Sequence, residues 1–80
     1  MTTGNADNYL RDLGELVKEQ ARAAKAAKEA VAGSDDHDFE LGRLTAWHEV
    51  VSLMQQQALA FGISLAELSL DDVSPERDLT

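Results

Sequence analysis

Cysteine is missing from this 80-residue sequence, and proline occurs once, as Pro75. Without cysteine the chain has no disulfide and no thiolate ligand for a metal ion. Two histidines are too few for a zinc site built on imidazoles. A single core in so short a chain supplies only about 3–5 kcal/mol of stability unless something else adds to it. Association with another chain is the remaining common source of stability, so we expect an oligomer.

Positive charge is also scarce, because seven Lys and Arg residues face fifteen Asp and Glu residues, for a net charge of −8. Nucleic-acid binding depends mostly on neutralising phosphates, so this balance disfavours a nucleic-acid partner. The acidity keeps a small protein soluble, and it also suits a basic partner or mimicry of a nucleic acid.

Long apolar runs are absent as well. No stretch of about 18 apolar residues exists, so we expect no membrane span. The first ten residues, "MTTGNADNYL", lack both a cationic and an apolar segment. We therefore expect no secretory signal and a cytoplasmic location.

The segment from Asp7 to Ala32 contains no proline and carries small or apolar residues in steps of three and four. These residues are Leu10, Leu13, Val17, Ala24, Ala27 and Val31, with Gln20 in the remaining place. The spacing predicts a helix over about 7–32, ended by Gly33. Its alanine-rich second half either lets a bulky side chain such as Trp47 approach closely or covers the tapered end of a bundle.

A second helix is predicted over about 36–61, after a turn at 33–36 that is short enough to make the two helices antiparallel neighbours. Its apolar residues fall on two adjacent seams. The first seam is Leu44, Trp47, Val51, Met54, Ala58 and Phe61. The second seam is Phe39, Ala46, Val50, Leu53 and Ala60, with Arg43 and Gln57 as its polar members.

After Gly62, Ser64 and Glu67 have the spacing of a capping box, which predicts a short helix at 65–68. The acidic tail at 71–80 is expected to be flexible. The fold class is therefore all-α, a single domain over 1–80, with an antiparallel helical hairpin and a short C-terminal third helix.

The two seams of the second helix are wider than one neighbouring helix can cover. Pairing of two hairpins into a four-helix bundle would bury both seams, and a twofold homodimer is the commonest such assembly. Another protein, or the C-terminal leucines of the same chain, are the alternative covers. The predicted interface is Phe39, Arg43, Leu44, Ala46, Trp47, Val50, Val51, Leu53, Met54 and Gln57. Arg43 and Gln57 either fix the register of pairing or lie at its rim.

Chemistry-bearing residues are few. Asp35, Asp36, His37, Asp38 and Glu40 lie together at a predicted helix start, where acids are expected without any metal. His48 and Glu49 point about 100° apart on a helix, so they do not form an acid–base pair. We expect no catalytic, cofactor or metal site.

Five of the seven bases lie on the first helix: Arg11, Lys18, Arg22, Lys25 and Lys28. Acids four positions later, such as Glu15 after Arg11 and Glu29 after Lys25, favour salt bridges within the helix. A weak strip for anions or RNA is the alternative, which the neighbouring acids oppose.

The segment "DFELGRLTAWHEVVSLMQQQALAFGI" resembles uncharacterised small helical-hairpin proteins of bacteria and their phages. The resemblance covers about a third of the chain and implies a hairpin fold without an assigned activity. The architecture is also similar to that of the dimeric plasmid primer-repressor hairpin, whose RNA-contacting residues have no match here.

The sequence therefore predicts a non-enzymatic protein–protein interaction module, a small regulator or adaptor that acts as a homodimer. The alternative is an acidic phage-type inhibitor or nucleic-acid mimic that blocks a basic site on a host protein.

Overall fold

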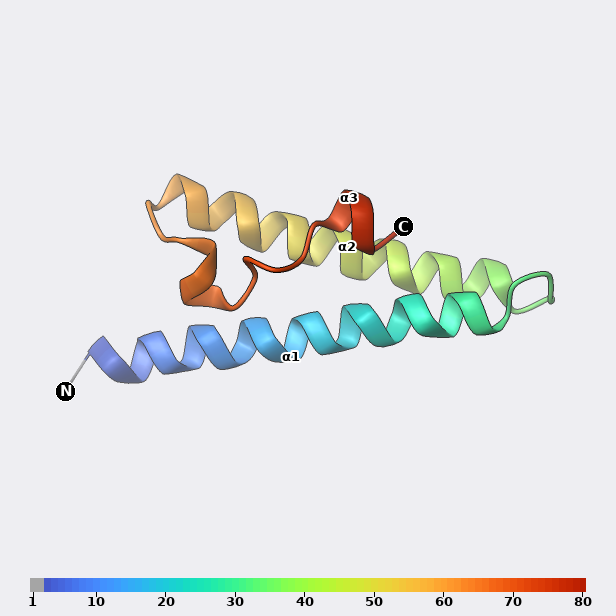
Figure 1. Ribbon diagram of the computed structural model, residues 1–80, viewed down its shortest axis with the longest axis horizontal. Helices are drawn as coiled ribbons and strands as arrows, with labels where there is room; N and C mark the ends of the chain where they lie inside the picture. The colour runs from blue at the N-terminus through green and yellow to red at the C-terminus, as the bar shows by residue number, and fades with distance from the viewer. Residues whose placement is uncertain (1–2) are drawn as a thin grey trace.

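Two long helices packed antiparallel dominate the computed structural model, which describes residues 3–80 (Figure 1). The elements are α1 (Thr3–Ala30), α2 (His37–Ala60), the 3-10 helix η1 (Leu65–Leu68) and α3 (Pro75–Asp78). The molecule is elongated, with extents of 50 × 21 × 16 Å. The predicted all-α hairpin with a short C-terminal helix is confirmed, and η1 has the predicted bounds.

The helix ends differ from the predicted ones by a few residues. α1 begins at Thr3 rather than near Asp7, and the turn that follows it extends over 31–36. At the end of α2, Gly62 adopts a positive φ of 71°. The N–H of Ile63 donates to the carbonyl of Ala58 at 2.8 Å, as in a helix closed by a left-handed glycine. This closure turns the chain back toward the hairpin.

The core receives side chains from three parts of the chain. α1 supplies small residues, α2 supplies one seam, and the segment after α2 supplies most of the large apolar groups. The buried apolar residues are Ala21, Ala24, Leu44, Val51, Ala58, Leu68, Leu70, Val73 and Leu79. Trp47 and Met54 are half-buried and pack against this core. The predicted first seam of α2 is therefore confirmed, except that Phe61 at its end is exposed.

The register of α1 departs slightly from the predicted seam. Ala24 is buried as expected, but Gln20 is exposed and the neighbouring Ala21 is buried instead. Gly14 and Lys18 are also buried. The inward side of α1 is thus rotated toward the C-terminal segment, which packs on the same helix.

Residues 71–80 differ from the flexible tail that their charge led us to expect. They contain α3 and bury Val73, Pro75 and Leu79. Pro75 occupies the first turn of α3, and the N–H of Ser74 donates to the Asp78 carboxylate at 2.9 Å. The reason for the difference is that four acids and one proline conceal a few well-spaced apolar residues, which enter the groove between the two long helices.

The start of the C-terminal segment is fixed against α1 at Gly14. A Cβ atom at this position would lie 1.7 Å from the carbonyl oxygen of Leu68, so only glycine lets η1 approach this closely. The predicted capping box is confirmed. The carboxylate of Glu67 accepts hydrogen bonds from the N–H of Ser64 at 2.8 Å and from its hydroxyl at 2.9 Å. The backbone hydrogen bond from Ser64 holds the pKa of Glu67 below its ordinary value.

Candidate interaction surface

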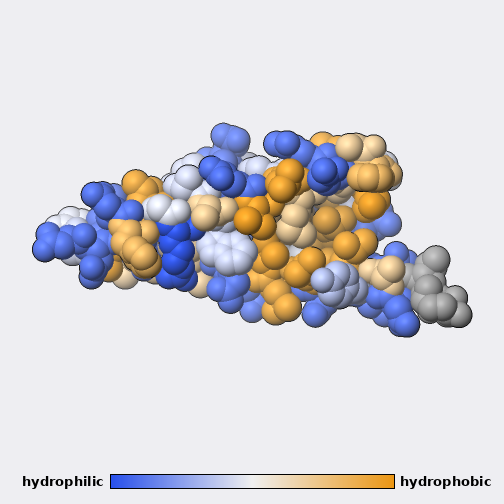
Figure 2. All heavy atoms as spheres, turned by 180° about the vertical axis from the view of Figure 1, so that it is seen from behind, coloured by the Kyte–Doolittle hydropathy of each residue, from blue (hydrophilic) through white to orange (hydrophobic). Residues whose placement is uncertain are grey.

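The side of the hairpin opposite the C-terminal segment carries the second seam of α2. We call it the bare face and define it by one stripe of α2 side chains: Phe39, Arg43, Ala46, Val50, Leu53, Gln57 and Phe61. Phe39 is 73% exposed, Leu53 is 59% exposed and Val50 is 38% exposed. Figure 2, seen from behind Figure 1, shows apolar side chains gathered over the middle and the open end of this side, with hydrophilic groups more frequent toward the turn. The C-terminal leucines therefore do not cover the second seam.

The predicted interface residues divide between this face and the interior of the chain. Phe39, Arg43, Ala46, Val50, Leu53 and Gln57 are exposed on the bare face. Leu44 and Val51 are fully buried within the hairpin. Trp47 and Met54 are half-buried at the boundary between the two groups. Leu44 and Val51 thus contribute to the fold of the chain, whereas the first group is available for contact.

Near the open end of the hairpin, the bare face is hollowed. The N-terminal part of α1 and the C-terminal part of α2 border a hollow of about 300 Å³. Its apolar lining includes Leu10, Leu53, Met54, Phe61, Ile63 and Leu68, and Gln57 contributes to its wall. A hollow of this size and lining suits an aromatic or aliphatic side chain from a partner.

One charged residue, Arg43, belongs to the bare face. Its Nη1 lies 3.1 Å from Oε1 of Glu40, one turn earlier on the same helix. A guanidinium carries five N–H donors, so this contact leaves others for a second acceptor. The bare face therefore offers many apolar side chains and one preorganised donor.

The opposite side, which we call the tail face, is covered by residues 69–80. Lys18 is only 4% exposed there. Its Nζ donates to the carbonyl of Ser69 at 2.6 Å and to Oδ1 of Asp72 at 2.8 Å. From α2, Nε2 of Gln55 donates to the carbonyls of Leu70 and Val73 at 3.0 and 2.9 Å. Two polar side chains, one from each long helix, thus hold the segment in the groove.

The basic residues of α1 make most of their contacts with residues 69–80. Arg22 lies 3.6 Å from Asp72, and the Nζ atoms of Lys25 and Lys28 donate to the carbonyl of Thr80. The predicted pair of Lys25 with Glu29 is present at 3.5 Å, whereas Glu15 lies 3.5 Å from Lys18 rather than pairing with Arg11. The hydrogen bond from Lys18 is the main reason that the pKa of Asp72 lies below its ordinary value. The bases therefore bind acidic and carbonyl groups of the same chain.

Sequence reasoning missed the residues that hold the segment. The sequence places Lys18 among the five bases expected to form salt bridges within the first helix. Nothing in the local pattern singles out Gln55 or Gly14. Each of these roles depends on a contact between residues at least fifteen positions apart in the sequence, which helix periodicity does not reveal.

The acidic cluster at the start of α2 does not form a site. Nδ1 of His37 lies 3.7 Å from Oδ1 of Asp38. Within residues 3–80, no group of three or more His, Asp or Glu side chains is arranged to hold a metal ion. His48 is half-buried and lies beside a hollow bordered by Leu79, while Glu49 is exposed.

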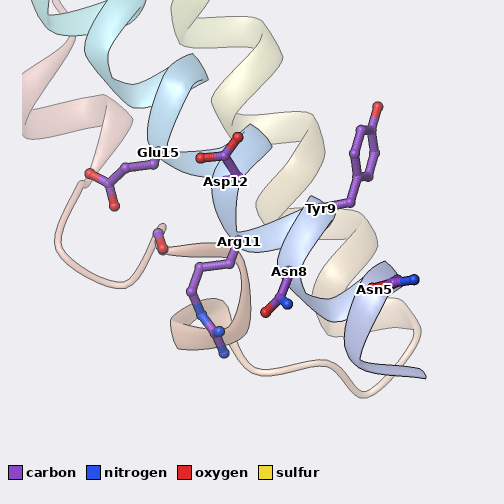
Figure 3. A pocket seen from close by; sticks show the side chains of 7 residues that line it. Asn5, Asn8, Tyr9, Arg11, Asp12 and Glu15 are labelled. Carbon is purple, nitrogen blue, oxygen red and sulfur yellow. The ribbon is translucent and has the colours of Figure 1, made fainter. Parts of the chain in front are cut away.

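A hollow of about 690 Å³ lies along the first turns of α1 and includes Ser69. Figure 3 shows that its side chains fan outward from one helix rather than converge. In this view Arg11 points downward, Tyr9 points upward, and Asp12 and Glu15 point away from the arginine. Such divergence favours a hydrated surface rather than a binding site.

Comparison with known proteins leaves the surface as the main guide to function. No family model matches the chain, and no match was found among curated proteins or among solved structures. Among the described residues, none of the helices combines the length and the hydrophobicity that crossing a bilayer requires.

Proposed function

We propose that this chain is a non-enzymatic helical interaction module, a small regulator or adaptor that works as a homodimer through its bare face. The observation that carries the proposal is the exposure of Phe39, Val50 and Leu53 on a stripe with a single charged residue. Arg43 is the one charged residue among the seven that define this stripe. Contiguous exposed apolar groups of this kind mark interaction surfaces.

The dimensions of the molecule leave room for such a contact. The whole side that carries the bare face spans at most 50 × 21 Å, an upper limit of roughly 1000 Å², and each partner of a standard interface buries ~800 Å². A second copy needs no complementary charge, because the stripe carries almost none. The same stripe on both copies is the arrangement that a twofold dimer requires.

The test compares two exposed leucines of α2. Leu53 lies on the bare face, whereas Leu59 is 69% exposed and borders a hollow on the tail face beside Val73 and Pro75. We expect Leu53→Glu to shift the mass measured by sedimentation equilibrium from dimer to monomer, since it would bury a charge without a partner. Leu59→Glu should leave the dimer mass unchanged.

The proposal fails if the unaltered chain sediments as an 8.7 kDa monomer at high concentration. Equal loss of the dimer in both variants would show that the contact does not use the bare face.

A further inference from the structure

We propose that the two copies pair with their α2 helices antiparallel about Val50, so that Phe39 of each copy fills the hollow of the other. This inference rests on the proposed homodimer and adds its orientation. It follows from the spacing along the stripe and from the shapes of its two ends.

The spacing is symmetric about Val50. Phe39, Arg43, Val50, Gln57 and Phe61 follow one another in steps of four, seven, seven and four. At about 100° per residue, all five lie within about 20° of one line along the helix. In an antiparallel twofold pair, positions equally far from the centre lie opposite one another. Phe39 then meets Phe61, Arg43 meets Gln57, and Val50 meets its own counterpart.

The two ends of the stripe are complementary in shape. Phe39 projects at the turn end, and the apolar hollow bordered by Phe61 lies about 33 Å away along α2, at 1.5 Å for each of 22 residues. Apolar cavities near 150 Å³ already accept benzene, so a hollow of about 300 Å³ accepts a phenyl ring. A parallel pair would instead place hollow against hollow and leave both unfilled.

The polar members of the stripe also match in this orientation. Arg43 uses Nη1 for Glu40 at 3.1 Å. The side-chain carbonyl of Gln57, at the wall of the hollow, accepts a hydrogen bond from another guanidinium N–H of the opposite copy. Arg43 therefore keeps hydrogen-bond partners when the two surfaces come together, as a charge buried among apolar groups requires. A parallel pair does not bring these two residues together.

The first experiment measures the orientation. Because the chain has no cysteine, Asp38→Cys introduces a single spin-label site at a fully exposed position of α2. In the antiparallel dimer, the two labels lie about 36 Å apart or more, since each is 12 residues from the centre. Double electron–electron resonance should show this distance.

The outcomes separate the orientation from the dimer. A label distance below about 25 Å would place the α1–α2 connections of both copies at the same end of the assembly. This result would overturn the antiparallel arrangement but not the dimer. A monomer mass with no dipolar signal would overturn the proposed function as well.

The second experiment asks whether Phe39 and Phe61 touch across the interface. Phe39→Ala and Phe61→Ala should each weaken dimerisation about tenfold or more, as expected for buried aromatic anchors. The double variant should weaken it by clearly less than the product of the two, because both changes remove the same contact. A control cycle of Phe39→Ala with Leu59→Ala should be multiplicative.

If the Phe39 and Phe61 effects multiply within about twofold, as they do for distant independent sites, the two rings do not meet and the seating of Phe39 in the hollow is wrong.

Discussion

The two faces of the hairpin are covered in the opposite way to what their composition suggests, because the polar face is buried by the chain and the apolar face is exposed. On the tail face, α1 carries a basic stripe and α2 carries His48, Ser52 and Gln55, yet this side is covered by residues 69–80. On the bare face, α2 carries Phe39, Val50 and Leu53, yet this side is open.

The difference lies in what the covering segment offers. Residues 69–80 bring Leu70, Val73 and Leu79 for the core, and they also bring acids and carbonyls for Lys18 and Gln55. A polar surface is thus covered by a segment that satisfies its hydrogen bonds. The bare face lacks such groups, so only another apolar surface fits it. Stability on either side of this contrast is to be compared at a fixed chain concentration, because dimerisation adds to apparent stability.

The largest effect is expected from the apolar part of the covering segment. Leu70 is fully buried, so Leu70→Ala should lower the free energy of unfolding by about 3 kcal/mol through lost transfer energy and a residual cavity. Urea unfolding followed by circular dichroism measures this. Leu59→Ala serves as the matched control on an exposed leucine and should change stability by less than about 0.5 kcal/mol. Equal effects would mean that the segment does not contribute to the core.

A smaller effect, with opposite signs at two glycines, is expected from the close approach of η1 to α1. Alanine normally stabilises a helix interior by up to about 1 kcal/mol relative to glycine. Gly42→Ala should show that gain, because an added Cβ meets nothing within 4 Å. Gly14→Ala should instead lose about 2 kcal/mol, since the Cβ collides with the Leu68 carbonyl and forces the segment away. A gain in both variants would show that η1 does not rest on α1.

Residues within regular helices were the ones that sequence reasoning placed well. The steps of three and four on α2 correctly predicted that Leu44, Val51 and Ala58 face inward. Ser64 and Glu67 correctly predicted η1, because a capping box depends on residues only three apart. The second seam was expected to be wider than one neighbouring helix covers, with the C-terminal leucines as one possible cover. The structure leaves Phe39, Val50 and Leu53 exposed, and the role of this seam in a dimer stays a prediction.

The covering segment escaped prediction for a physical reason. Its apolar residues are separated by acids and a proline and follow no helix or strand period, so its composition resembles that of a disordered tail. Its stability depends on Lys18 and Gln55, which lie about fifteen to fifty positions away and show no local sign of that role. Contacts of this kind become visible only when the hairpin brings both helices together.

The smallest effect concerns acid. The pKa values of Asp72, Glu67 and Asp78 all lie below their ordinary range, because Lys18, Ser64 and Arg77 respectively donate hydrogen bonds to their carboxylates. The folded state therefore binds fewer protons than the unfolded chain in acid. The stability that these groups contribute is complete above their ordinary pKa values of about 4 and is lost as the pH falls below them.

We therefore expect the melting temperature to decrease as the pH drops under about 4. Part of this decrease is due to Asp72. Asp72→Asn should melt at a lower temperature than the unaltered chain at pH 7, because it lacks the charged acceptor for Lys18 at 2.8 Å. The melting temperature of Asp72→Asn should decrease less on acidification, so that its curve of melting temperature against pH converges with that of the unaltered chain toward pH 2. Melting followed by circular dichroism across this range measures the convergence. Asp35→Asn, in the turn between α1 and α2, is the control and should follow the unaltered chain. Parallel curves for Asp72→Asn would show that the Lys18 contact does not hold the segment on the tail face.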